Sequence, residues 1–456
     1  MKKSWLTLAL VSVAFSPAVL AVSSQTSSRQ VSNNQTTDQA KEIADLKKRL
    51  EVLEKDDGVA ETRAIGVGNK KVFGIGSDEY NEVLFINDFG INTDLSLLHQ
   101  RRFVHHYFHG FDNAPRVMLS GNASGTVGSH SHALPINAGQ GHQFMEASVL
   151  FDTVGYANED WLAYMQFTAD AFGEDTDLGV KQAFVTYGNF DKLPVYLTMG
   201  YQYVPFGSYT TAFITDTLVQ DLSRTQVPAM TGGYVYTKDQ LNLNASAFWF
   251  DGKTHTSDQR RLNQWGLNAQ LRNEKLGPSK DFNFTVGASF MNNLASSNSI
   301  KDEVGDDNQL KHYVPAADVR FQIEKGAFTF YSEYVQALQG FSDADFTQTD
   351  AGDEPDHVVP EAAHFEASYS FPVWGMKTEL SLEYDQTVDA LAFELPQEQY
   401  GASYQLTPYE NTYLTFEYMH KIDYDEDVNT TAAGVAQYTG TGLSDDMFQM
   451  QVNVYF

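Results

Sequence analysis

A cluster of histidines and arginines near position 100 contains the residues of this sequence best suited to binding a ligand. The stretch "HQRRFVHHYFHGF" (99–111) holds six of them: His99, Arg101, Arg102, His105, His106 and His109. Neutral imidazoles bind transition metals, and a cationic group attracts an anionic chelate. His105 and His109 share one face if this stretch is helical. The alternative, which we prefer, is a basic interfacial segment that binds nothing, so the sequence leaves open whether a metal binds.

A second stretch, "KIDYDED" (421–427), raises the question of a Ca²⁺ loop. Asp423, Asp425 and Asp427 have the first spacing of an EF-hand. The sixth position, however, is Val428 where an EF-hand needs glycine, and no glutamate closes the loop. We therefore expect solvated acidic loops here and no specific Ca²⁺ site.

Several other kinds of chemistry are disfavoured. The chain contains no G-x-S-x-G, H-E-x-x-H or P-loop motif, so we expect no enzyme and no cofactor. It contains no cysteine, which excludes disulfides and thiolate metal sites. Its formal net charge of −29 makes it a poor ligand for nucleic acid, which requires clustered lysines and arginines.

Sixteen short runs of alternating apolar and polar residues follow between residue 116 and the end of the chain. In the run 377–385, for example, Leu380 and Leu382 alternate with Ser381 and Glu383. This period of two predicts strands with one apolar face. The weakest run is 230–237, which two glycines dilute. The polar face carries ten charged candidates: Glu146, Asp170, Lys181, Asp318, Arg320, Glu366, Lys377, Glu379, Glu383 and Glu417.

The connections between these runs alternate in length. Short connections include 238–240, 325–326, 372–375 and 407–411, whereas the long ones between them include 204–229, 291–315, 337–362 and 421–447. The third gap, 172–179, and the eighth, 273–281, depart from the rule. Outer-membrane barrels have short periplasmic turns and long external loops, and a soluble sandwich has no reason to sort loops this way. Residues 116–456 are therefore predicted to form an all-β, 16-stranded antiparallel transmembrane β-barrel.

A barrel of this size leaves an interior that side chains cannot fill, so water enters it. The ten charged candidates then line a hydrated lumen, where their burial carries no large penalty. Any one of them either contributes to passage of a solute or only solvates the wall.

The segment before the barrel reads as four parts. Residues 1–21 form a secretory signal peptide, and residues 22–37 form a flexible polar linker. Residues 38–57 predict a short periplasmic coiled coil with the seam Ile43, Leu46, Leu50 and Leu53. This helix either pairs with copies of itself, giving a homo-oligomer, or docks on its own protein. Residues 58–115 form a connector of unclear structure.

The chain ends on the strictly alternating run "MFQMQVNVYF" (447–456). Its apolar face consists of Phe448, Met450, Val452, Val454 and Phe456, which we expect to meet outer-membrane lipid. We also expect Tyr455 and Phe456 to lie in the periplasmic aromatic girdle. A terminal aromatic residue resembles the signal read by the barrel-assembly machinery, which makes that machinery a predicted partner. Both chain termini are then periplasmic, in a Gram-negative bacterium.

The signal peptide, the coiled coil, the absence of a large plug domain and the sixteen strands together resemble the legiobactin-receptor family of siderophore porins. The resemblance covers residues 38–456 and includes the stretch "YVPFGSYTTAFITDTLVQDLSRTQ" (203–226), whose PFG segment is also similar to phosphate-selective porins. It implies uptake of a ferric siderophore across the outer membrane, and it implies no binding residue. The negative net charge opposes steering of an anionic ferric chelate. The alternatives are a general or anion-selective diffusion porin and a structural or adhesive surface protein.

Overall fold

A computed structural model describes residues 93–98, 116–131, 134, 143–172, 175–238, 240–256, 262–276, 281–304, 309–349, 356–409, 411–432 and 438–456. All of them belong to one compact unit, which begins at Thr62. The predicted signal peptide, linker and coiled-coil seam (Ile43, Leu46, Leu50 and Leu53) lie outside the described residues. So do His99, Arg101, Arg102, His105, His106 and His109. No helix among the described residues is long and apolar enough to cross a membrane.

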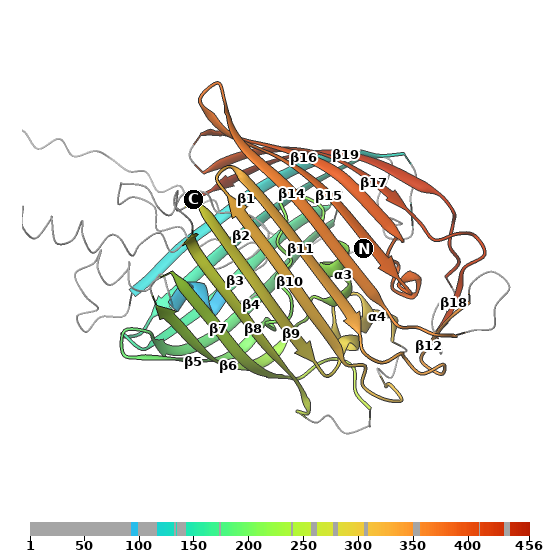
Figure 1. Cartoon of the computed structure of the whole chain (residues 1–456), viewed down its shortest axis with the longest axis horizontal. Coiled ribbons are helices and arrows are strands. Elements are labelled where there is room, and N and C mark those ends of the chain that lie inside the picture. Colours follow the sequence, from blue (N-terminus) through green and yellow to red (C-terminus); the bar gives the residue numbers. More distant parts are fainter. Residues whose placement is uncertain are drawn as a thin grey trace, which may run out of the picture. The chain divides into compact units, whose positions relative to one another are not determined.

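Within the described part of the chain, sixteen strands form one closed antiparallel barrel, which confirms the predicted fold (Figure 1). They are β1 (Arg116–His130), β2 (Gln143–Tyr156), β3 (Trp161–Phe172), β4 (Asp175–Asn189), β5 (Leu193–Tyr203), β6 (Gln226–Lys238), β7 (Leu241–Phe250), β8 (Gln264–Leu276), β9 (Phe282–Met291), β10 (Ala316–Lys325), β11 (Phe328–Ala337), β14 (Glu361–Val373), β15 (Met376–Val388), β16 (Glu398–Tyr409), β17 (Thr412–Ile422) and β19 (Ser444–Tyr455). The barrel closes where β1 pairs with β19, from Asn122 opposite Tyr455 to His130 opposite Met447.

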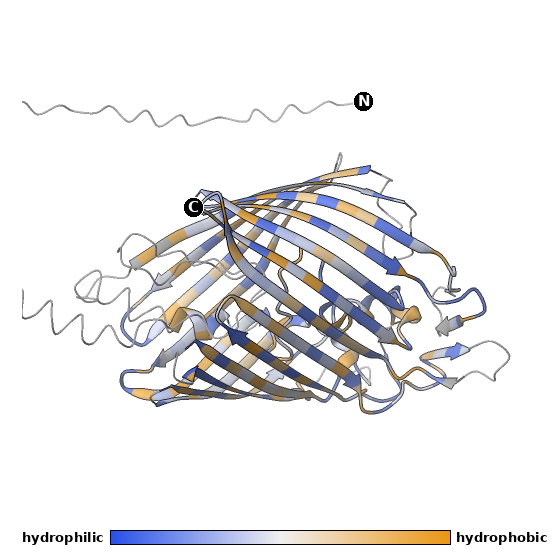
Figure 2. Cartoon of the chain, turned by 45° about the horizontal axis from the view of Figure 1, so that its top comes forward, coloured by the Kyte–Doolittle hydropathy of each residue, from blue (hydrophilic) through white to orange (hydrophobic). Residues whose placement is uncertain are grey.

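The strands alternate between apolar residues on the outside and polar residues on the inside. On β15, Leu382 is 57% exposed, whereas its neighbours Ser381 and Glu383 are buried. Figure 2 shows the same alternation of hydropathy along the other strands. An apolar outer surface of this extent is stable in lipid and would promote association in water. The structure is therefore a transmembrane barrel with a polar interior.

The connections sort by length as predicted. One end of the barrel carries tight turns such as 326–327 and 374–375, where Gly326 and Gly375 have φ values of +57° and +83°. The connection at 173–174 stays an exception, since it is short at the end that carries the long connections. The eighth connection is shorter than predicted, because β8 continues to Leu276.

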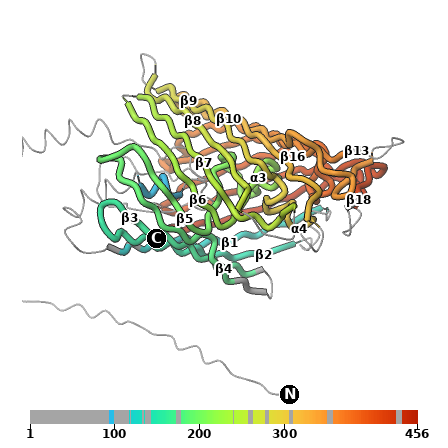
Figure 3. Tube along the Cα trace, turned by 90° about the horizontal axis from the view of Figure 1, so that it is seen from below, coloured from blue at the N-terminus to red at the C-terminus, as the bar shows by residue number. Residues whose placement is uncertain are grey.

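The long connections gather at the other end of the barrel. They contain η3 (Leu294–Ser296), α4 (Ile300–Glu303), η4 (Leu391–Phe393) and a small sheet of β12 (Phe346–Thr349), β13 (Asp356–His357) and β18 (Asn429–Ala432). Phe346 of β12 packs with Phe341 and Phe393, and the ring centroids of the three lie 5.0 to 5.8 Å apart. Figures 1 and 3 show this sheet at the end opposite the C-terminus.

Candidate functional site

The connection between β5 and β6, residues 204–225, folds into the barrel. Its helix α3 (Leu218–Ser223) begins after Thr217, whose side chain accepts a hydrogen bond from Gln220 N at 3.2 Å. The helix lies against β11, β14 and β15, which are far from β5 and β6 in the order around the barrel. Figure 1 shows α3 between the walls of the barrel. The connection therefore crosses the lumen and narrows it.

A carboxylate on β11 holds the first turn of this connection. Ser208 N and Tyr209 N donate to the two oxygens of Glu333, at 2.7 and 2.8 Å. Tyr331 on the same strand donates its phenol hydroxyl to Glu333 as well. Gly207 and Tyr209 have φ values of +82° and +54°, a conformation that turns consecutive N–H groups toward one anion.

Three further carboxylates continue this pattern around the wall. Ala212 N donates to Glu366 Oε2 on β14 at 3.0 Å, and Ile214 N donates to Glu417 Oε2 on β17 at 2.5 Å. Leu218 N, at the start of α3, donates to Asp385 Oδ2 on β15 at 2.8 Å. Hydrogen bonds from N–H groups to charged acceptors are about twice as strong as those between neutral groups. We call Glu333, Glu366, Asp385 and Glu417 the loop anchors.

The loop anchors change the meaning of two predicted residues. The sequence placed Glu366 and Glu417 on the inner face because they alternate with apolar residues, and both are buried there. Their charge, however, is stabilised by backbone N–H groups of residues 204–225 in addition to any water in the lumen. Glu333 and Asp385 were absent from the predicted set, although each occupies an inward position in an alternating run. The period of two could have identified both.

Asp318 and Arg320, also predicted, form a buried pair on β10. Arg320 donates to Asp318, to Ser289 Oγ at 2.9 Å and to Asn268 Oδ1 at 2.5 Å. Ser289 Oγ also accepts from Gly207 N at 3.4 Å. This ion pair therefore supports the first turn of the inserted connection, beside Glu333.

Three predicted residues lie on β2, β3 and β4, away from the loop anchors. Glu146, Asp170 and Lys181 are all partly exposed. Asp170 accepts hydrogen bonds from Ser148 Oγ at 2.5 Å and Thr168 Oγ1 at 2.8 Å.

The remaining three lie on β15. Lys377 is exposed beside the tight turn 374–375, so it marks the rim of the barrel. Glu379 is buried and accepts from Ser370 Oγ at 2.8 Å. Glu383 is buried, and its Oε2 has no hydrogen-bond partner within the described part of the chain.

A short helix at residues 93–98 also lies inside the barrel, near the end with the tight turns. Leu95, Leu97 and Leu98 are buried in a cluster with residues of β2 to β6, among them Tyr156. Asp94 Oδ2 accepts a hydrogen bond from Thr198 Oγ1 at 2.5 Å. The sequence predicts only a connector over residues 58–115, because a single buried turn gives no periodicity to detect.

The constriction carries its own charges. Arg224 lies 3.4 Å from Asp216 Oδ2 and stacks over the Tyr203 ring, 5.6 Å from its centroid. Burial, reinforced by Asp216, raises the pKa of Asp221 to about 7, against the opposing effect of Arg224. Asp221 is thus a carboxyl group inside the lumen that titrates near neutral pH.

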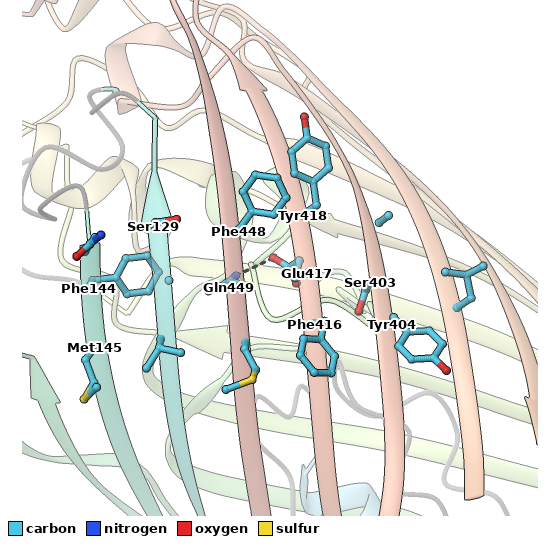
Figure 4. A pocket seen from close by; sticks show the side chains of 16 residues that line it. Ser129, Phe144, Met145, Ser403, Tyr404, Phe416, Glu417, Tyr418, Phe448 and Gln449 are labelled. Carbon is cyan, nitrogen blue, oxygen red and sulfur yellow. Dashed lines mark hydrogen bonds between the residues drawn. The ribbon is translucent and has the colours of Figure 1, made fainter. Parts of the chain in front are cut away.

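The predicted C-terminal strand is β19. Phe448, Val452, Val454 and Phe456 are exposed on its outer face, and Met450 is partly exposed. Figure 4 shows Phe448 beside Gln449, which donates to Glu417 Oε1 at 2.7 Å across to β17. The expected position of Tyr455 is wrong, because it points inward and packs edge-on against Tyr413, with ring centroids 5.3 Å apart. Alternation forces this separation, since neighbours on a strand face opposite sides.

Comparison with known proteins finds both similar solved structures and sequence relatives. No family model matches it. Among solved structures, the outer membrane channel DcaP of Acinetobacter baumannii is 13% identical with a TM-score of 0.45, over 76% of this chain and 98% of that one. An anion-selective porin from Comamonas acidovorans is 12% identical with a TM-score of 0.46, over 75% of this chain and all of that one. These scores are too low to transfer any property.

Sequence relatives are more informative. A "UPF0422 protein" of Legionella pneumophila is 26% identical over 400 residues, which cover 81% of this chain and 73% of the relative. A "UPF0422 protein" of Coxiella burnetii is 30% identical over 352 residues, which cover 75% of this chain and 72% of the relative. Identity at this level over most of both chains establishes common descent, and the chain therefore belongs to the UPF0422 family.

Proposed function

We propose that the protein is a diffusion porin, a water-filled outer-membrane channel whose constriction is formed by residues 204–225. The observation that carries this proposal is the set of loop anchors. They hold a connection across the lumen by at least one backbone hydrogen bond on each of four wall strands. A surface protein that only adheres to a matrix gains nothing from a fixed constriction.

A polar interior supports the same proposal. The inward positions of β7 include the polar side chains Asn242, Asn244 and Ser246, followed by the buried Phe248 and Phe250. Such polar side chains are stable where water completes their hydrogen bonds. A lumen of this kind passes small hydrophilic solutes.

The charges in the constriction favour cations over anions. The connection carries two carboxylates here, Asp216 and Asp221, and one guanidinium, Arg224, which already pairs with Asp216. The net charge of −29 acts in the same direction at longer range. We therefore favour a general, mildly cation-preferring pore over the anion-selective alternative.

Uptake of a ferric siderophore stays a prediction that rests on resemblance alone. The names of the relatives carry no function, and carboxylates surround the constriction. An anionic ferric chelate would meet repulsion there. A saturable reduction of single-channel current by micromolar ferric chelate would support siderophore binding, whereas unchanged current would oppose it.

Planar-bilayer recording of the purified full-length protein tests the porin proposal. We expect stepwise conductance in KCl, and a reversal potential under a KCl gradient whose sign shows cation preference. Replacing residues 208–222 by a short glycine–serine linker should raise the conductance of each step. A folded barrel that gives no conductance steps, with or without this connection, would refute the proposal.

A further inference from the structure

Four ionisable side chains meet on the inner wall where β14 pairs with β15. His364 lies opposite Asp385, and Glu366 lies opposite Glu383, so the four occupy adjacent inward positions. All four are buried, with His364 and Asp385 at 0% exposure. Each of His364, Glu383 and Asp385 has one atom able to ligate a metal ion, and these three atoms lie within 4.8 Å of one another.

Asp385 fixes the orientation of the histidine. Its Oδ1 lies 2.5 Å from His364 Nδ1, while its Oδ2 accepts from Leu218 N at 2.8 Å and Gln399 Nε2 at 3.0 Å. Because a carboxylate oxygen accepts hydrogen bonds, this contact places the imidazole proton on Nδ1. The lone pair of a neutral His364 is then on Nε2.

Two ligand atoms in this cluster have no hydrogen-bond partner among the residues that the structure describes. They are His364 Nε2 and Glu383 Oε2. The other oxygen of Glu383 has only a weak contact, with Gln399 Nε2 at 3.5 Å. Glu366 Oε2 is 3.8 Å from His364 Nε2, too far for a hydrogen bond. Buried polar atoms normally have a hydrogen-bond partner. The two atoms without one, His364 Nε2 and Glu383 Oε2, therefore point to a partner other than the described residues.

The charge of the cluster points to a cation as that partner. Glu366, Glu383 and Asp385 bring three carboxylates to one neutral imidazole. The positive charge of Lys421 on β17 also acts on Glu383. Glu366 and Asp385 already accept backbone N–H groups, whereas Glu383 accepts none among the described residues, so Glu383 is the buried carboxylate that still lacks a close partner. A divalent ion would supply this partner and accept the free lone pairs of Glu383 and His364.

We propose that this cluster is a binding site for a divalent transition-metal ion, with His364 Nε2 and Glu383 as ligands and Glu366 beside them. Ligands about 2.0–2.2 Å from one ion are separated by roughly 3–4 Å. A ligand atom of His364 and one of Glu383 lie within 4.8 Å of each other, so a small side-chain movement would bring both to one ion. Asp385 is the positioning residue, because metal-binding histidines usually donate their other ring N–H to a carboxylate. An imidazole ligand favours Zn²⁺, Cu²⁺, Ni²⁺ or Fe²⁺ over Ca²⁺ and Mg²⁺.

The site would also connect the wall to the constriction. Asp385 Oδ2 holds Leu218 at the start of α3, and Glu366 holds Ala212 in the same connection. A bound ion would thereby stiffen residues 204–225. This inference does not depend on what the channel transports.

Zn²⁺ titration of the full-length protein tests the site. The protein is purified in detergent without a polyhistidine tag and freed of metal with chelator, and binding is measured by calorimetry with Ca²⁺ in excess. We expect one tight Zn²⁺ per chain. Glu383→Gln and His364→Ala should abolish it, and Asp385→Asn should weaken it about 10- to 100-fold, as the loss of an orienting carboxylate does elsewhere.

Glu379→Gln is the matched control, because it removes a buried carboxylate from the same face of β15, outside the cluster. It should bind Zn²⁺ as the wild type does. Barrel assembly of each variant is checked by heat-dependent gel mobility. If a variant fails to assemble, a second measurement is made on the wild-type protein: the visible spectrum of bound Co²⁺. Bands typical of nitrogen and oxygen ligands would support the site.

The alternative is a protonated His364 that bridges Asp385 and Glu366 without metal. Absence of tight Zn²⁺ binding by the wild type would overturn our inference in favour of this ion pair. Equal binding by the wild type, Glu383→Gln and His364→Ala would also overturn it, since the metal would then sit on acidic loops. Displacement by equimolar Ca²⁺ would exclude the imidazole as a ligand.

Discussion

Replacing Glu333 by alanine tests the constriction at its first turn. In the native structure both oxygens of Glu333 accept backbone hydrogen bonds, from Ser208 N at 2.7 Å and Tyr209 N at 2.8 Å. The Tyr331 hydroxyl is a third donor to the same carboxylate. The substitution leaves all three donors without their acceptor and keeps the strand intact, because β11 loses no backbone pairing.

The magnitude follows from the two backbone donors. A buried donor left without an acceptor costs about 1–3 kcal/mol, so the pair costs about 2–6 kcal/mol. Water in the lumen replaces part of the lost hydrogen bonding. The free-energy cost to the first turn should therefore lie near the lower limit of this range, at about 2–3 kcal/mol. Since about 1.4 kcal/mol is a factor of ten, the population with a detached first turn should rise roughly 30- to 150-fold.

Single-channel recording measures this population as time spent in states of higher conductance. Limited chymotrypsin digestion near Tyr209 gives a second readout that does not depend on conductance. Glu379→Ala is the control, since Glu379 is a buried wall carboxylate on β15 that accepts from Ser370 on the neighbouring strand. If Glu333→Ala matched both Glu379→Ala and the wild type in conductance and in protease protection, the loop anchors would not hold the constriction.

Three further predictions concern the same lumen. Gly207→Ala should loosen the constriction as Glu333→Ala does, because a Cβ at this φ of +82° would lie 2.5 Å from the Tyr209 ring; higher open-channel current would show it. Cation preference should increase as pH rises through about 7, because Asp221 ionises there, and Asp221→Asn should remove this step from the reversal potential. Leu95→Ala with Leu98→Ala should release residues 93–98, at about 2–5 kcal/mol per leucine, and raise the conductance; an unchanged current would place this segment outside the conducting path.

The barrel could be predicted from the sequence because its physics is local and repeated. Each strand meets lipid on one side and water or polar groups on the other, which imposes a period of two on each run. Every predicted run coincides with a strand of the barrel. The boundaries differ at some strand ends: β4 begins at Asp175 and β6 at Gln226, five and four residues before the predicted runs. Residues 175–179 and 226–229 do not alternate in hydropathy, so strand pairing extends beyond the pattern that predicts it.

The constriction could not be predicted, because its determinants are distant along the chain. The sequence shows that Glu366 and Glu417 face inward, but a carboxylate facing water and one facing a backbone N–H occupy identical positions in the pattern. Their partners, Ala212 and Ile214, are more than 150 residues away. No local pattern in residues 204–225 indicates that its N–H groups are unpaired among themselves and need acceptors across the lumen.

That need explains why the inner wall is acidic. A connection that crosses a lumen without forming a sheet leaves backbone N–H groups unsatisfied, and burying them unpaired is costly. Lysine and arginine are donors only and cannot serve, whereas each ionised carboxylate accepts several N–H groups. Glu333, Glu366, Asp385 and Glu417 use this capacity on consecutive parts of residues 204–225. Glu383 lies among them without such a donor, and it is the carboxylate for which a bound cation gives a physical reason.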